Sequence, residues 1–264
     1  MDYKLKQCLD NVRKPARYTG GEYNSILKDP AAVDCRFALC FPELYEIAMS
    51  HLGSKILYGR LNAMENVWCE RMYAPAADME AEMRRVGLPL YGLESKDPAS
   101  KFDIFGFSLQ YELNYTTVLN MLDLAGIPKF SSERTELTPL VIAGGPCVYN
   151  VEPVVDFFDI IMVGEGEENL PALTELYIRA KKERLVQGNL RLVLGKRFKA
   201  VLATPSAIHA VIKKNFGLGA ETIQRLREER GGAEINQELV FDVQGKESDS
   251  ALESTISAFV DQIL

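Results

Sequence analysis

The stretch Arg36-Phe-Ala-Leu-Cys-Phe41 is a short, almost continuous apolar run that ends at Pro42. Such a run, bounded by a turn residue, is typical of a β-strand that is buried on both faces of a sheet. A helix is predicted to follow from about His51 to Asn62. A buried strand followed by a helix is the unit from which parallel sheets are built, so this segment decides the fold class.

The same alternation recurs on both sides of this segment. Alternating strands and helices force parallel strands, right-handed crossovers and helices on both faces of the sheet. The sequence therefore predicts an α/β fold: a doubly wound, Rossmann-like (flavodoxin-like), mostly parallel sheet of about five strands, with a small C-terminal α/β appendage. Further strands are predicted at 67–73, 104–108, 140–143 and 160–163, and further helices at 5–12, 78–86, 115–124 and from about 167 to 180.

Composition excludes several classes of protein. The 264 residues are 25% charged and carry a net charge of −7, so nucleic acid is not an expected partner. No apolar run is long enough to cross a bilayer, and the charged start of the chain does not resemble a signal peptide. We therefore expect a cytoplasmic protein without membrane insertion, and the five scattered cysteines fit reduced thiols.

Charge also divides the chain. Residues 186–264 hold 10 basic and 10 acidic residues, leaving 20 of the 30 basic and 27 of the 37 acidic residues in 1–185. A charged run, Lys181-Lys182-Glu183-Arg184, is followed by Gly188 and is typical of a boundary. Two domains are predicted, at 1–185 and 186–264.

In doubly wound sheets a ligand binds beyond the carboxyl ends of the strands, where helix N-termini and loop amides converge. This places the candidate site in the loops 41–53, 108–111, 144–150 and 164–167. Glycine pairs in two of these loops permit close backbone approach to a ligand, although a single Gly-Gly is more often only a turn. No loop has the GxGxxG or GxxxxGK[ST] pattern of nucleotide sites.

Several motifs then carry a resemblance, in order and with similar spacing, over about residues 1–180. They are Lys14-Pro-Ala-Arg-Tyr-Thr-Gly-Gly-Glu-Tyr-Asn24, Cys40-Phe-Pro-Glu-Leu-Tyr-Glu-Ile-Ala-Met-Ser-His-Leu-Gly53, Gly106-Phe-Ser-Leu-Gln-Tyr-Glu112, Ala143-Gly-Gly-Pro146 and Gly164-Glu-Gly-Glu-Glu168. The chain resembles the N-terminal part of cobalamin-binding-domain radical SAM proteins. The resemblance implies cobalamin as cofactor. The cofactor-binding residues implied are Ser108, Leu109, Gly144, Gly145, Gly164 and Gly166, with His51 as an addition.

His51 departs from the cobalamin signature Asp-x-His-x-x-Gly, in which a carboxylate orients a cobalt-ligating histidine. Here the segment is Met49-Ser50-His51-Leu52-Gly53-Ser54, so methionine replaces the aspartate and the glycine comes one residue early. A lone histidine at a strand-to-helix turn is more often a capping or packing residue than a metal ligand. We therefore expect a capping or packing role for His51, and no metal site is predicted.

The chain also lacks the three cysteines, spaced Cys-x-x-x-Cys-x-x-Cys, that hold the iron–sulfur cluster of a radical SAM enzyme. Cys35 and Cys40 lie five apart on one predicted strand and so face opposite sides of the sheet. The iron–sulfur cluster and S-adenosylmethionine are thus implied only for a domain that this sequence does not contain. No catalytic residue is predicted, and we expect no activity from this chain alone.

The segment from about 187 to 264 resembles a fragment of the N-terminal domain of type II secretion and type IV pilus assembly ATPases. Its features are a predicted strand at 198–203, an N-cap at Thr204 and a helix that ends near Gly217. His209 lies in that helix, where a surface or packing role is expected. The two parts together are typical of a fusion, a truncated product or a gene assembly error.

Three functions follow as hypotheses. The first is a cobalamin-binding module that presents its cofactor to a radical SAM domain. The alternative is an interaction or assembly fragment of a secretion or pilus system, with an empty α/β scaffold and secretion or pilus components as partners. The third is an unrelated α/β enzyme with Glu165 and Glu167 as a carboxylate pair. A simpler explanation, which we favour, is that both glutamates lie at the start of a helix and complement its dipole.

Overall fold

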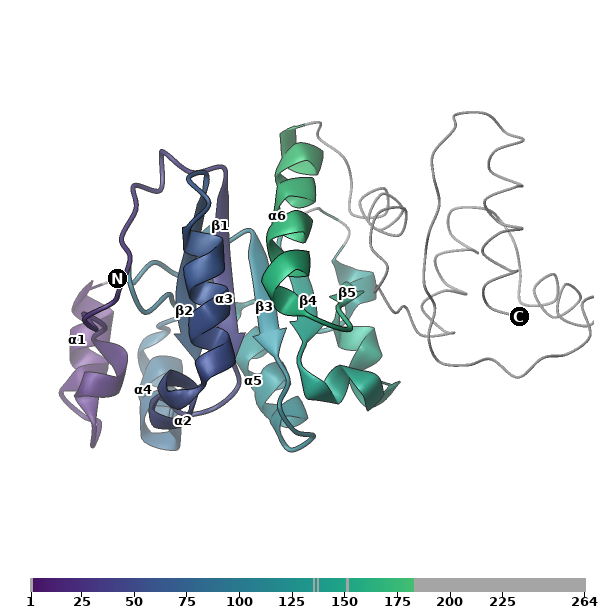
Figure 1. Cartoon of the computed structure of the whole chain (residues 1–264). Helices are drawn as coiled ribbons and strands as arrows, with labels where there is room; N and C mark the ends of the chain where they lie inside the picture. Colours follow the sequence, from purple (N-terminus) through teal and green to yellow (C-terminus); the bar gives the residue numbers. More distant parts are fainter. Residues whose placement is uncertain (1, 135, 137, 151, 183–264) are drawn as a thin grey trace, which may run out of the picture.

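The computed structural model describes residues 2–134, 136, 138–150 and 152–182. Strands and helices alternate along this part of the chain (Figure 1). The strands are β1 (Cys35–Phe41), β2 (Val67–Tyr73), β3 (Ile104–Ser108), β4 (Leu140–Gly144) and β5 (Ile160–Ile161). The α-helices are α1 (Asp2–Leu9), α2 (Tyr45–Ser50), α3 (Leu52–Asn62), α4 (Ala77–Val86), α5 (Asn114–Ala125) and α6 (Gly166–Lys182). The second predicted domain, 186–264, and the secretion-ATPase resemblance lie outside the described residues.

The five strands form one sheet in the order β2-β1-β3-β4-β5, and every neighbouring pair is parallel. This strand order is that of a flavodoxin-like doubly wound sheet, so the predicted fold class is confirmed. The order reverses between β1 and β3, because the chain moves from β1 outward to β2 and then returns to the other side. The loops after β1 and β3 therefore diverge at the carboxyl edge of the sheet.

Helices cover both faces of the sheet (Figure 1). Side chains alternate along β1, so that Phe37 and Leu39 join one core while Ala38 and Cys40 join the other. The first core contains residues of α3 and α6, and the second contains residues of α1, α4 and α5. Cys35 belongs to the α3/α6 core, which confirms that it and Cys40 face opposite sides.

The edge strand β2 carries charged residues that are nevertheless buried. Glu70 pairs with Arg36 at 2.5 Å, and Arg71 pairs with Glu94 at 2.6 Å, where both carboxylates are inaccessible to solvent. The segment after α4 also bonds to the strand backbone, since the N–H of Leu93 donates to the carbonyl of Arg71. Buried polar groups are tolerated when they are paired, so these contacts explain why a strand of mixed composition closes the sheet.

The amino edge of the sheet is held by two buried aspartates. Asp103, just before β3, accepts hydrogen bonds from the backbone N–H of Arg36 and from Lys181 Nζ of α6, at 2.9 and 2.7 Å. Asp159, just before β5, accepts from Arg134 Nε at 3.0 Å, and both side chains are almost fully buried. These carboxylates join the starts of the strands to one another and to the end of α6.

Two local predictions need correction, and one short helix was not predicted. The first helix ends at Leu9 instead of running to residue 12, and a 3₁₀ turn begins at Pro15. The last strand has two residues where four were predicted, and α2 was not predicted because it is only six residues long. In the part of the chain that the structure describes, no helix has the length and apolar character needed to span a bilayer.

Candidate functional site

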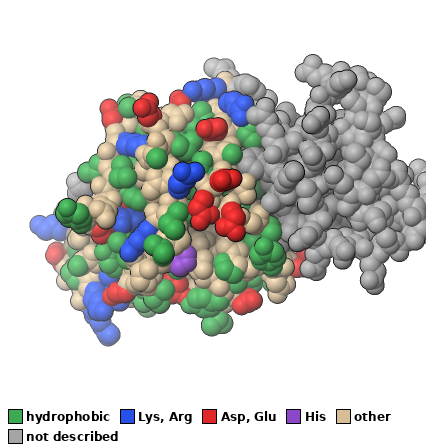
Figure 2. Space-filling model, viewed as in Figure 1, with side chains coloured by type: hydrophobic (Ala, Val, Ile, Leu, Met, Phe, Trp, Pro, Cys, Tyr) green, Lys and Arg blue, Asp and Glu red, His purple; other side chains and the backbone are tan. Residues whose placement is uncertain are grey.

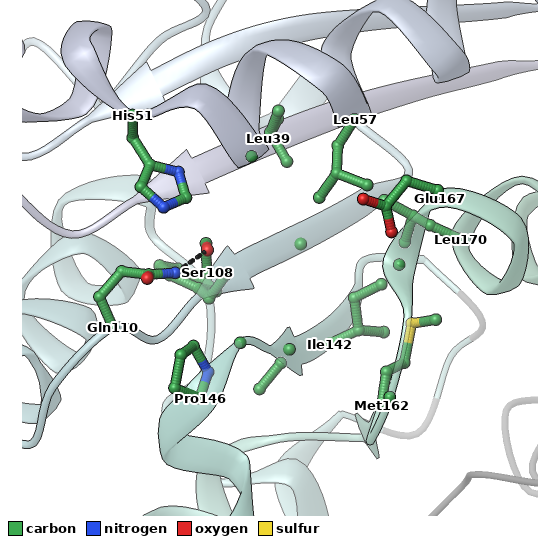
Figure 3. Close-up of a pocket in the computed structure, with 18 residues that line it drawn as sticks. Leu39, His51, Leu57, Ser108, Gln110, Ile142, Pro146, Met162, Glu167 and Leu170 are labelled. Carbon is green, nitrogen blue, oxygen red and sulfur yellow. Dashed lines mark hydrogen bonds between the residues drawn. The ribbon is translucent and has the colours of Figure 1, made fainter.

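A cavity of about 250 Å³ lies at the carboxyl edge of the sheet, between the N-terminal ends of α3 and α6 (Figure 3). Its floor is formed by β3 and β4, and loops after four strands reach it. This is the place at which doubly wound folds bind ligands. The lining residues are Leu39, His51, Gly53, Leu57, Gly106, Phe107, Ser108, Gln110, Ile142, Ala143, Gly144, Gly145, Pro146, Met162, Gly164, Gly166, Glu167 and Leu170.

The fold brings most of the predicted site residues together. Six of them line the cavity, namely His51, Ser108, Gly144, Gly145, Gly164 and Gly166. The seventh, Leu109, does not: its side chain is fully buried in the core on the other face of the sheet. The backbone N–H of Leu109 donates to the carbonyl of Gly144 at 2.8 Å, so this residue holds the loop after β4 in place.

Two glycines in the cavity lining have little room for a side chain, and one of them is required by its backbone conformation. Gly145 has a φ of +101°, and a Cβ there would lie 2.6 Å from the carbonyl oxygen of Leu109. Gly166, the first residue of α6, lies so near α3 that a Cβ would come 3.1 Å from Leu57 Cδ2. A side chain at Gly145 would displace the backbone, whereas one at Gly166 would require the end of the Leu57 side chain to move by a few tenths of an ångström. Of the Gly144-Gly145 pair, Gly145 is thus the residue that lets the loop after β4 turn tightly against the backbone of Leu109.

One end of the cavity is polar and uncharged (Figure 3). Ser108 Oγ accepts a hydrogen bond from Gln110 Nε2 at 2.7 Å, which leaves the serine hydroxyl proton for another acceptor. The His51 ring lies opposite this pair, with one nitrogen turned toward them. A serine hydroxyl and an imidazole N–H at one end of a cavity are suited to donate hydrogen bonds to an oxygen of a ligand.

The other end is apolar, with one acid at its rim. Its side chains are Leu39, Leu57, Ile142, Met162 and Leu170. Glu167 lies beside Leu57 and Leu170 in Figure 3 and is in the first turn of α6. Glu165, by contrast, does not line the cavity, so the two residues of the predicted carboxylate pair do not meet there. Glu167 and Glu168 lie where negative charge complements the dipole of α6.

Exposed apolar side chains surround this edge. In Figure 2 the purple side chain is His51, since it is the one histidine in the part of the chain that the structure describes, and hydrophobic and acidic groups lie near it. Leu52, which follows His51, is 68% exposed, and Leu113, at the start of α5, is 81% exposed. Ile47 in α2, Tyr111 just after β3 and Tyr149 in the 3₁₀ helix after β4 are also exposed. The edge therefore offers an apolar surface around a small cavity.

The cysteines do not fit an iron–sulfur cluster. All five are buried, with Cys35 and Cys69 in one core and Cys8, Cys40 and Cys147 in the other. Burial raises the pKa of the Cys35, Cys40 and Cys69 thiols well above the usual range, which opposes the thiolate form that iron requires. Within the described residues no three His, Cys, Asp or Glu side chains are grouped to hold a metal ion.

Sequence reasoning did not identify several lining residues. Gln110 lies two residues after Ser108 in the motif Gly106-Phe-Ser-Leu-Gln-Tyr-Glu112. Because it follows the end of a predicted strand, it could have been predicted to reach the site. Leu57 is four residues after Gly53 and hence on the same face of α3. Met162 and Leu170 gave no such signal, because nothing in an apolar residue distinguishes the lining of a cavity from the interior of a core.

Comparison with known proteins bears on this arrangement. A family model described as radical SAM proteins, N-terminal, matches residues 53–197, which is more than half of the chain. The chain belongs to this family. The radical SAM N-terminal match includes the loops after β3, β4 and β5, and so most of the cavity lining.

Among curated proteins, this chain is similar to an uncharacterized protein of Methanocaldococcus jannaschii. The two are 33% identical over 89 residues, which is 33% of this chain and 18% of the relative. This chain thus matches less than a fifth of that relative's length. No solved structure matches the chain.

Proposed function

We propose that the described domain is a cobalamin-binding module of a radical SAM protein and that its cavity takes the nucleotide tail of the cofactor. The observation that supports this most directly is the convergence of His51, Ser108, Gly145 and Gly166 on one cavity. These residues come from four different loops of the sheet's carboxyl edge. Membership of the radical SAM N-terminal family supports the connection to radical SAM chemistry.

The size and chemistry of the cavity fit part of the cofactor. Its volume of about 250 Å³ is below the range of roughly 300–1,000 Å³ that is usual for whole small-molecule ligands. An aromatic base with its sugar would bind inside, while the larger corrin ring would lie on the apolar surface around the mouth. Exposed Leu52 and Leu113 give that surface the apolar character that a flat macrocycle requires.

Each end of the cavity would have a distinct role. The apolar end, with Leu57, Ile142 and Leu170, would pack against the base. At the other end the Ser108 hydroxyl would donate to the phosphate, and at the rim Glu167 would accept from a sugar hydroxyl. Glycine at Gly145 keeps the backbone close enough for these contacts.

Bound cobalamin would supply alkyl-group or electron-transfer chemistry to a radical SAM domain. The iron–sulfur cluster and S-adenosylmethionine would belong to that domain, because the described cysteines are buried and dispersed. On this proposal the chain's own residues bind and orient the cofactor and exclude water from its tail. A radical SAM domain, in the same polypeptide or a separate one, is the partner.

The test is a titration of the full chain with hydroxocobalamin, followed by its visible spectrum and by co-migration in gel filtration. We expect saturable binding with a spectral shift, and weaker binding of cobinamide, which lacks the nucleotide tail. If tens of micromolar hydroxocobalamin caused no spectral change and did not co-migrate with the chain, the proposal would be refuted. If cobinamide bound with equal affinity, the nucleotide tail would not be the part of the cofactor that binds in the cavity.

A matched pair of variants on α3 locates the site. Leu57→Phe adds volume at a residue that lines the cavity, whereas Ile56→Phe adds the same ring at the preceding residue, which is 40% exposed and is not part of the lining. Cobalamin affinity is expected to fall at least tenfold in the first variant and to remain unchanged in the second. Equal effects of the two variants would contradict the proposed site.

A further inference from the structure

His51 is the N-cap of α3, and this role fixes the chemistry of its ring. The backbone N–H of Ser54 donates to His51 Nδ1 at 3.1 Å, and Ser54 Oγ lies 3.0 Å from the same nitrogen. An N-cap side chain must accept this bond, because the first N–H groups of a helix have no partner within it. In the neutral ring one nitrogen accepts and the other donates, so the proton is assigned to Nε2.

The ring is also held in one orientation. Its centroid lies 4.9 Å from that of the Phe41 ring, and the two planes are tilted by 47°. On another side, a Cβ at Gly53 would come 2.9 Å from His51 Cε1, so this glycine leaves just enough room for the ring. The nitrogen that does not cap the helix faces the polar end of the cavity, toward Ser108 and Gln110 (Figure 3).

This arrangement is opposite to that of a metal-ligating histidine. A histidine that ligates through Nε2 has its proton on Nδ1 and donates it to a carboxylate or carbonyl oxygen. Here Nδ1 faces the backbone N–H of Ser54. At the sequence position where the cobalamin signature has the orienting aspartate, this chain has Met49. Ligation through Nε2 would require a proton on Nδ1 and would break the cap of α3.

We infer that His51 is a hydrogen-bond donor to an oxygen of the bound cofactor, through Nε2–H, and is not an axial ligand of cobalt. This inference rests on the proposed function for its ligand, but the tautomer on which it depends is a property of the free chain. Together with the Ser108 hydroxyl, His51 would give the polar end of the cavity two neutral donors. Two such donors select for an acceptor oxygen such as that of a phosphate.

The tautomer is tested without any ligand. In the chain labelled with ¹⁵N-histidine, two-bond ¹H–¹⁵N correlation spectra distinguish a proton on Nε2 from one on Nδ1. The chain has two histidines, so a His51→Asn variant assigns the signals of His51. We expect the proton on Nε2. A proton on Nδ1 would overturn the inference whatever the chain binds.

The role toward the cofactor is tested by electron paramagnetic resonance of the bound, reduced cob(II)alamin. Nitrogen coordination splits the cobalt signal into triplets for ¹⁴N and doublets for ¹⁵N. We expect the same spectrum from the labelled and unlabelled chains, because no histidine nitrogen is bound to cobalt. A change to doublets on labelling would refute the inference while supporting the proposed function. Failure of the wild-type chain to bind cobalamin would refute the proposed function, and with it the ligand assigned to His51.

The variant His51→Asn separates the two roles of the side chain. Asparagine is among the best N-cap residues, so α3 and the melting temperature should be preserved. Its side chain is too short to place a donor where Nε2 lies, so cobalamin affinity should fall by about tenfold, the effect of one lost hydrogen bond. Unchanged affinity in a folded His51→Asn chain would contradict a donor role.

Discussion

The amino and carboxyl edges of the sheet differ in the character of their side chains. At the amino edge, Asp103 and Asp159 are buried and paired with Lys181 and Arg134. At the carboxyl edge, the cavity is lined by apolar side chains, glycine backbone and neutral donors, with Glu167 at its rim. Buried ion pairs fix the starts of the strands in register, whereas small and neutral groups leave space at the ends. We propose that the amino edge provides stability and that the carboxyl edge provides the ligand-binding site.

The largest expected effect is at the amino edge. Arg134→Met removes the cation from the buried Asp159 carboxylate, which should lower the free energy of unfolding by about 3–5 kcal/mol. Urea denaturation measures this change. The exposed pair Lys182–Asp34 at the same edge provides the control, since Lys182→Met should cost only about 0–1 kcal/mol. If both variants lost the same small amount, the amino edge would not be the stabilising one.

A smaller effect is expected at the carboxyl edge. Gly145→Ala places a Cβ 2.6 Å from the Leu109 carbonyl oxygen at a positive φ, so stability should fall by about 1–3 kcal/mol and cobalamin affinity should fall with it. The control is Gly59→Ala in α3, where a Cβ would meet nothing within 4 Å. That variant should gain about 0.5–1 kcal/mol from helix propensity. Thermal denaturation compares the two, and a stabilised Gly145→Ala chain would contradict the shape argument.

The smallest effect concerns an exposed charge cluster near the carboxyl edge. Hydrogen bonds from Arg17, and then from its own backbone and Lys14, lower the pKa of Glu46 from its usual 4.5 to about 2. A lowered carboxyl pKa favours the folded state above pH 4.5, and this contribution is lost as the pH falls through about 2.

The variant Glu46→Gln should therefore show a smaller drop in melting temperature over that pH range than the wild type. Arg17→Gln should reduce the drop similarly, because it removes the main hydrogen-bond partner. A pH dependence that is identical in all three chains would show that this exposed cluster contributes nothing. Such a result would sharpen the contrast with the buried pairs of the amino edge.

Much of the fold could be predicted from hydrophobic periodicity. The run at 36–41 and the runs at 104–108 and 140–143 are buried on both faces, and such runs occur almost only in parallel sheets covered by helices. Periodicity failed for α2, which is too short to show a repeat, and for the length of the last strand. The order of strands on either side of β1 followed from the general rule for such folds and not from any residue.

The candidate site was predicted less completely, for a reason visible in two neighbours. Ser108 and Leu109 were both expected to face the ligand, yet only Ser108 lines the cavity, because successive residues at a strand end point to opposite faces. The sequence pattern predicted which loop reaches the cavity but not which side chain of that loop faces it. For His51 a capping or packing role was expected from its position at a strand-to-helix turn, and the hydrogen bond from the Ser54 N–H shows that it is a cap.

The sequence by itself determined the alternation of buried strands and helices, the loops with glycine and serine, and the absence of a Cys-x-x-x-Cys-x-x-Cys motif. These features are local, so neighbouring residues are enough to specify them. Only the tertiary structure decided that Leu57 of α3, Ile142 of β4 and Leu170 of α6 enclose one cavity and that the His51 ring turns its second nitrogen into it. Such features depend on distances between segments far apart in the chain, which packing of the whole sheet and its helices fixes.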